Sequence, residues 1–232
     1  MVNVESLVVV LALIVDALFG DPRWLYSRIP HPIVWMGTLI GVIDRWVNRA
    51  SEVLIYARVA GAVCMSGFLS LAVVTGWFLQ SWLLSYEFGW VVCALIASTL
   101  IAFRSLYDHV LSVARALEVS LADGREAVSH IVGRDPQALD QSGVCRGAIE
   151  SAAENFSDGV VVPVFWFVLF GLPGLLGYKM INTLDSMWGH RNVRYRHFGW
   201  AAARVDDVVN WVPARIAGCL FVLSALLMPN AN

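Results

Sequence analysis

Four charged side chains recur every four residues between positions 146 and 158. They are Arg146, Glu150, Glu154 and Asp158, and this spacing places them along one face of a helix. Carboxylates spaced in this way repel one another by roughly a few tenths of a kcal/mol per pair, which favours a compensating cation. Mg²⁺ is suitable, because it binds one or two carboxylates together with substrate phosphates. The alternative is a solvated acidic face that arginines neutralise.

A second group of polar side chains lies where a long apolar run ends. Asn182, Asp185 and Ser186 are dense there, and each needs a partner if it is buried. Arginines follow, including Arg194 and Arg196, which suggests a clamp for a phosphate or a carboxylate around Asp185. For these two arginines, a basic collar that binds anionic lipid is an equally open interpretation.

Two further groups carry carboxylates. Asp206 reaches Asn210 at i+4, while Asp207 and Asn210 share a helical face. Such adjacent aspartates are typical both of metal-phosphate sites and of helix caps.

Asp16 interrupts an apolar helix shortly before the Asp21-Pro22 pair. A carboxylate inside a membrane indicates function, unless it lies at a helix end and reaches the interface.

The composition indicates which class of protein carries these polar groups. The chain has 232 residues, of which 58% are hydrophobic and 15% charged, with a mean hydropathy of +0.66. Soluble domains carry about 25% charged residues, so this is a polytopic membrane protein. The formal charge of −2 provides no field to attract nucleic acid, and no nucleic-acid partner is expected. The standard phosphate-loop motif is absent from the sequence.

We expect an all-α fold in one membrane-embedded domain over residues 1–232, with about four to five membrane segments. The segments are predicted at about residues 5–20, 59–82, 88–104, 159–178 and 216–229, separated by a helical polar region at 104–158 and a polar region at 179–215. The run 159–178 contains Gly171-Leu172-Pro173-Gly174, which favours a re-entrant hairpin. Both strongly cationic regions would then face the cytoplasm.

Many of these residues fall into ordered motifs that cover nearly the whole chain. The motifs are Asp16-Ala-Leu-Phe-Gly-Asp21-Pro22, His31-Pro32, Trp35-Met36-Gly37, Arg104-Ser105-Leu106, Ile131-Val132-Gly133-Arg134-Asp135, Glu150-Ser-Ala-Ala-Glu154-Asn155, Asp158-Gly159, Pro163, Tyr178-Lys179, Asn182-Thr183-Leu184-Asp185-Ser186-Met187, Phe198-Gly199, Arg204-Val205-Asp206-Asp207, Asn210 and Pro213-Ala214-Arg215. Together they resemble the adenosylcobinamide-phosphate synthase (CobD/CbiB) family of cobalamin biosynthesis.

The resemblance implies a multipass membrane protein, and the distribution of cations predicts a cell-membrane protein whose active site faces the cytoplasm. Family members join the propionate carboxyl of adenosylcobyric acid, a cobalt corrinoid, to (R)-1-aminopropan-2-ol or its O-phosphate. ATP and Mg²⁺ are the implied cofactors, and the implied mechanism is attack of the amine on an acyl phosphate. Membrane lipids and other enzymes of the pathway are the further partners that the resemblance suggests.

The residue types and their spacing, together with the resemblance, select the site residues, and the division of roles among them is a hypothesis. The predicted catalytic residues are Glu150, Glu154, Asp158, Asp185 and Asp207, and Glu154, Asp158 and Asp185 are the candidate Mg²⁺ ligands. The predicted substrate- or phosphate-binding residues are Arg134, Arg146, Asn155, Lys179, Asn182, Ser186, Arg204 and Asn210.

The sequence also departs from the family pattern. Family chains usually continue for some tens of residues beyond the Pro213-Ala-Arg215 motif, so a truncated chain, a shortened variant and a partly degenerate copy all stay open. His190-Arg191 also stands where Tyr-Lys is usual. Two other functions stay open. A non-catalytic membrane scaffold would tolerate replacement of Glu154 and Asp185, and a transporter or receptor would suit an intramembrane Asp16, although the sequence shows no inverted repeat.

Overall fold

The computed structural model describes residues 4–48, 54–129 and 136–228, and within these residues the chain is helical and has no strand. The helices are α1 (Val4–Phe19), α2 (Arg23–Tyr26), α3 (Pro32–Val47), α4 (Leu54–Leu83), α5 (Gly89–Ser98), α6 (Phe103–Val119), α7 (Leu121–Ser129), α8 (Gln141–Phe156), α9 (Val162–Trp188), α10 (Trp200–Asn210) and α11 (Pro213–Leu227). A 3₁₀ turn lies at Pro136–Ala138, and a π-helical turn at Ser157–Val161 joins α8 to α9. The prediction of an all-α fold is confirmed.

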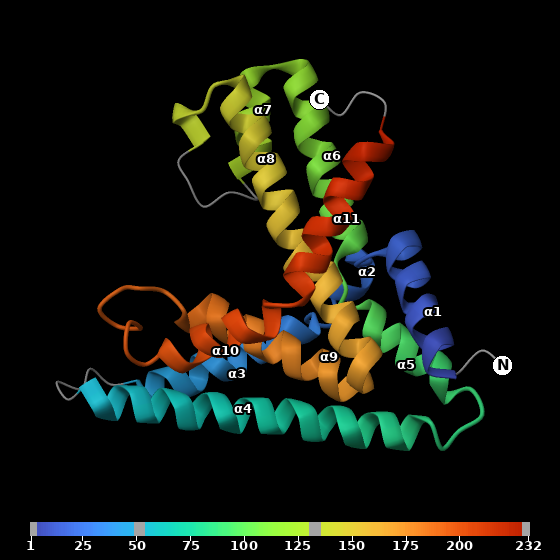
Figure 1. The fold of residues 1–232 in the computed structure, drawn as a ribbon, viewed down its shortest axis with the longest axis vertical. Coiled ribbons are helices and arrows are strands. Elements are labelled where there is room, and N and C mark those ends of the chain that lie inside the picture. The colour runs from blue at the N-terminus through green and yellow to red at the C-terminus, as the bar shows by residue number, and fades with distance from the viewer. Residues whose placement is uncertain (1–3, 49–53, 130–135, 229–232) are drawn as a thin grey trace.

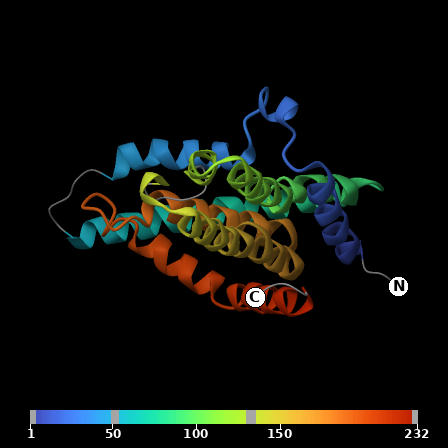
Figure 2. The ribbon, with the colours of Figure 1, turned by 90° about the horizontal axis from the view of Figure 1, so that it is seen from above.

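The helices form three groups that meet near α9, and one of them joins α1 and α5 to the first part of α9. In Figure 1, the later part of α9 and helix α10 lie along α4, and α3 also packs on α9. Helices α6, α7 and α8 form another group, which extends away from α4 in Figure 1 and overlaps α9 in the view from above in Figure 2. The small core of that group contains Val113, Val128 and Val144, which are fully buried.

Several of these helices are long and apolar enough to cross a membrane. Leu54–Leu83, Gly89–Val119 and Gln141–Trp188 meet this criterion, and α10 with α11 forms a fourth candidate that is bent by 48°. The first predicted segment, at about residues 5–20, corresponds to α1. Its apolar part, Ser6–Phe19, is shorter than the length a bilayer requires.

The predicted break in the run 159–178 is present at Gly171. This residue has φ +65°, in the left-handed region that glycine adopts readily, and α9 bends there. Interrupting the helix frees the backbone N–H of Leu172, which donates instead to Oε1 of Gln80 at 2.7 Å. The later part of α9 then runs beside α4, as Figure 1 shows. Re-entry of residues 159–178 by the same membrane face stays a prediction.

Asp16, the carboxylate within the first apolar helix, has a structural partner. It is 2% exposed, and its Oδ2 accepts a hydrogen bond from the backbone N–H of Phe103 at 2.9 Å. The backbone N–H of Arg104 faces the same carboxylate. Asp16 therefore caps the first turn of α6 from another helix and holds α1 against it.

Candidate active site

Polar residues from three elements gather around the second half of α9. Lys179 and Asp185 belong to α9, Asp158 to the π-helical turn, and Asp206 and Asn210 to α10. These five residues are called the acidic cluster below. Helix α9 packs against both the π-helical turn and α10, which brings the three elements together.

Hydrogen bonds of Tyr178 and Asn210 fix this arrangement. The Tyr178 hydroxyl donates to the backbone carbonyl of Asp158 at 3.1 Å and lies 3.4 Å from Oδ1 of Asn210. The Asn210 amide nitrogen in turn donates to Oδ2 of Asp206 at 2.9 Å. Tyr178 therefore links the π-helical turn to α10, and Asn210 orients the Asp206 carboxylate.

Negative charge exceeds positive charge in the acidic cluster. Asp158 interacts electrostatically with Lys179 and Asp185, and Asp206 interacts with both aspartates. Lys179 is only 5% exposed, and its amine interacts electrostatically with Asp158 and Asp21. The Oδ1 atom of Asp206 is buried and lacks a hydrogen-bond partner among the described residues. This oxygen can therefore accept from water or from a bound molecule, or contact a cation.

The donor set fits Mg²⁺ that arrives with phosphates, or the ammonium group of an amine. Among the described residues, no three His, Cys, Asp or Glu side chains are arranged to hold a metal ion. The predicted ligands Glu154, Asp158 and Asp185 therefore do not form a preassembled three-carboxylate site. Mg²⁺ commonly binds only one or two carboxylates when phosphates complete its coordination, so this donor set remains suitable.

The structure brings several of the predicted site residues together and separates others. Asp158, Lys179, Asp185 and Asn210 meet in the acidic cluster, and Glu154 interacts electrostatically with Asp158 from the exposed surface of α8. The π-helical turn interrupts the four-residue repeat where Asp158 lies.

The remaining predicted residues lie outside the cluster or at its edge. Arg146 and Glu150 are exposed on α8, and Arg134 lies outside the described residues. The side chains of Asn155 and Ser186 donate to backbone carbonyls one turn earlier, those of Ser151 and Asn182. Arg204 and Asp207 are both exposed and form an ion pair with each other at 3.4 Å.

Sequence reasoning selected Asp207, whereas Asp206 is the aspartate with a buried oxygen. The signal was available in the helical repeat, because Asp206 follows the buried Ala202 by four residues and precedes Asn210 by four. Tyr178 was also missed as a site residue. Asp21 was noted as part of a motif, and it interacts electrostatically with Lys179 and pairs with His31 at 3.5 Å.

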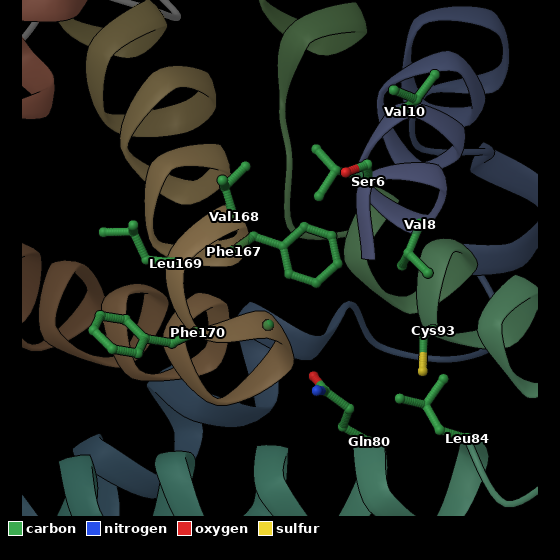
Figure 3. Close-up of a pocket in the computed structure, with 12 residues that line it drawn as sticks. Ser6, Val8, Val10, Gln80, Leu84, Cys93, Phe167, Val168, Leu169 and Phe170 are labelled. Atoms are coloured by element: carbon green, nitrogen blue, oxygen red, sulfur yellow. The ribbon is translucent and has the colours of Figure 1, made fainter. Parts of the chain in front are cut away.

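An apolar cavity of about 480 Å³ lies apart from the acidic cluster. Figure 3 shows that it is bordered by Val8 of α1, Gln80 of α4, Cys93 of α5 and Phe167 of α9. Its lining contains no charged side chain, so it does not provide the groups that carboxylate or phosphate chemistry requires.

Comparison with known proteins identifies the family. The model of the CobD/Cbib protein family matches residues 9–231. The chain belongs to the CobD/CbiB family. Its residues in the acidic cluster come from separate motifs of the family resemblance, Asp158-Gly159, Tyr178-Lys179, Asn182–Met187, Arg204–Asp207 and Asn210.

Curated members of the CobD/CbiB family are similar over most of this chain. The protein named "Cobalamin biosynthesis protein CobD" from Sinorhizobium sp is 45% identical over 228 residues, which cover 97% of this chain and 71% of the relative. The protein of the same name from Sinorhizobium fredii is 47% identical over 221 residues, covering 94% and 67%. That from Rhodobacter capsulatus is 46% identical over 217 residues, covering 93% and 68%. No solved structure matches the chain.

Proposed function

We propose that this membrane protein acts in cobalamin biosynthesis as an amide ligase. The proposed reaction joins adenosylcobyric acid to (R)-1-aminopropan-2-ol or its O-phosphate and yields adenosylcobinamide or its phosphate. Membership of the CobD/CbiB family and the names of the curated relatives support the pathway. The single structural observation that supports the reaction is the acidic cluster, in which three aspartates interact electrostatically around one buried lysine.

Each group of the acidic cluster has a proposed task. Asp158, Asp185 and Asp206 would bind cationic groups, namely Mg²⁺ together with substrate phosphates or the ammonium of the amine. The Lys179 amine would bind anionic oxygens of the corrin carboxylate or of a phosphoryl group. When bound, Mg-ATP would supply the phosphoryl group that converts a poor leaving group on the carboxyl into a good one. Glu154 and Asp207 would attract the same cations from the exposed edge of the cluster.

We also propose that the acidic cluster faces the cytoplasm of a cell membrane. Arg and Lys concentrate in residues 104–158 and 179–215, and cationic loops stay on the cytoplasmic side. Single cysteines at Arg125 and Arg194 would be labelled from one side only. Labelling of the two positions from opposite sides would contradict a re-entrant run at 159–178.

The test is conversion of adenosylcobyric acid by the purified protein in lipid nanodiscs, with Mg-ATP and each amine, followed by mass spectrometry. The wild type should form a product whose mass identifies the amine. Lys179→Gln should lose at least about 100-fold in turnover, which corresponds to about 2.7 kcal/mol of transition-state stabilisation. The matched control is Asp108→Asn, which removes an exposed ion pair with Arg104. Corrin binding without turnover in the wild type would support the scaffold alternative instead.

A further inference from the structure

The segment between α9 and α10 is a compact loop whose two ends meet. It comprises residues 189–199, called the 189–199 loop below. The Phe198 ring packs edge-to-face on Trp188 with 4.7 Å between ring centroids. The backbone of Gly199 lies so close to the Trp188 carbonyl that a Cβ atom has no space there. Packing therefore fixes the base of the loop and leaves its middle to be held by other contacts.

A buried carboxylate of α3 holds the middle of this loop. Asp44 is 5% exposed, and its Oδ2 lies 2.6 Å from Nη2 of Arg194 and accepts a hydrogen bond from the Tyr195 hydroxyl at 3.1 Å. Its Oδ1 accepts a hydrogen bond from the Asn48 amide at 2.9 Å. Burial and the hydrogen bond to Asp44 raise the pKa of Tyr195, so this hydroxyl stays protonated and keeps donating. Arg194, which the sequence left open between substrate and lipid, therefore has a partner within the chain.

The first residues of the same loop border Asp185 of the acidic cluster. The Gly189 N–H donates to the backbone carbonyl of Asp185 at 2.6 Å. A Cβ atom on Gly189 would collide with Oδ1 of Asp185, so the loop backbone lies directly against this carboxylate. His190 also interacts with Asp185 electrostatically. Displacing the loop would therefore change the surroundings of one carboxylate of the cluster.

Helix α3 provides a firm base for this connection. Its Gly37 and Gly41, one turn apart, both face the side chain of Met187 near the end of α9, at 3.7 and 3.8 Å from the position a Cβ atom would take. Close packing through small residues fixes α3 relative to α9. Asp44 thus connects α3, which packs on the end of α9, to the middle of the 189–199 loop.

We propose that Asp44 is a positioning residue for the acidic cluster: it fixes the 189–199 loop and thereby the orientation of Asp185. The expected effect of Asp44 on turnover rests on the proposed function. Its expected effect on the loop and on the orientation of Asp185 does not. Because Asp44 does not border the acidic cluster, its effect must pass through Arg194, Tyr195 and the loop.

The experiment compares Asp44→Asn, Arg194→Ala, Arg194→Lys and the double variant Asp44→Asn/Arg194→Ala with the wild type and Asp108→Asn. The first readout is the Mg²⁺ concentration that gives half-maximal turnover. The second uses no substrate: the rate at which trypsin cleaves the 189–199 loop at its exposed arginines. The third is maleimide labelling of the Asp185→Cys variant, with and without Asp44→Asn, quantified at that peptide by mass spectrometry.

Asp44→Asn and Arg194→Ala should each raise the half-saturating Mg²⁺ concentration at least threefold, and Arg194→Lys should restore it to within twofold of the wild type. The double variant should be no worse than the worse single variant, because both changes break one link. Asp44→Asn should also accelerate loop cleavage, and maleimide labelling of the Asp185→Cys variant, at least fivefold, with Asp108→Asn unchanged.

Unchanged cleavage and labelling in Asp44→Asn would overturn the inference, as would additive effects of the two changes. An unchanged Mg²⁺ requirement in an active enzyme would do the same. If the wild type forms no amide product, the proposed function fails separately, and the cleavage and labelling rates alone decide whether Asp44 positions Asp185.

Discussion

Replacing Asp206 by asparagine should make the protein more stable and less active. In the structure, Oδ2 of Asp206 accepts a hydrogen bond from Asn210 at 2.9 Å, and the buried Oδ1 lacks a partner among the described residues. Two other aspartates of the cluster, Asp158 and Asp185, repel its charge. Asparagine preserves the side-chain shape and an oxygen that can accept from Asn210, but it removes the charge.

The size of the stability change follows from the cost of the unpaired oxygen. Leaving a buried polar group unsatisfied costs about 1–3 kcal/mol. The new amide can donate toward the neighbouring carboxylates, so we expect the free energy of unfolding to rise by about 1 kcal/mol. For a chain of this size, this raises the melting temperature by about 2–4 °C. The loss of a cation-binding charge should lower turnover by about 100-fold, or about 2.7 kcal/mol in the transition state.

Both quantities can be measured on one preparation. Thermal unfolding in nanodiscs can be followed by the fluorescence of the ten tryptophans, and amide formation by mass spectrometry. Asp108→Asn is the control, because its exposed ion pair should change stability by less than about 0.5 kcal/mol. A destabilised Asp206→Asn protein, or one that retains full turnover, would refute the argument that Asp206 is kept at a structural cost for binding a cation.

Three further substitutions test other parts of the account. Asp16→Ala leaves two backbone N–H groups of α6 without their acceptor, so the free energy of unfolding should fall by about 3 kcal/mol. Thermal or denaturant unfolding measures this change, and an unchanged midpoint would exclude the capping role. Gly171→Ala should lower the free energy of unfolding by about 2 kcal/mol, because alanine is strained at φ +65° and its Cβ would collide with Gln80. An unchanged free energy of unfolding would contradict the bend at this residue. Asp207→Asn should reduce turnover less than Asp206→Asn does, and the reverse order would show that the exposed aspartate is the functional one.

Local features of the fold could be predicted from the sequence. Leu106, Val110, Val113, Leu117 and Leu121 repeat with the helical period. The first four lie in α6, where Val113 and Leu117 pack in the core of the α6–α8 group, whereas Leu121 begins α7. The break at Gly171 was predictable because glycine and proline act on the backbone where they stand. These features depend on the residues themselves and on their near neighbours along the chain.

The remaining features depend on contacts between distant segments. The cap provided by Asp16 requires Phe103, which is 87 residues away, so the sequence alone left a functional role open. The choice between Asp206 and Asp207 depends on which face of α10 meets α9. The four-residue repeat of charges from Arg146 to Asp158 is interrupted by a π-helical turn. The repeat itself does not indicate where such a turn begins.

The central claim is that this CobD/CbiB family member forms an amide bond on a corrinoid carboxyl. The most direct measurement is conversion of adenosylcobyric acid by the purified 232-residue protein with Mg-ATP and either amine, with and without Asp185→Asn. The account predicts a product with the mass of adenosylcobinamide or its phosphate, and a loss of that product in the variant. Corrin binding with no product from the wild type, or equal product from the variant, would contradict it.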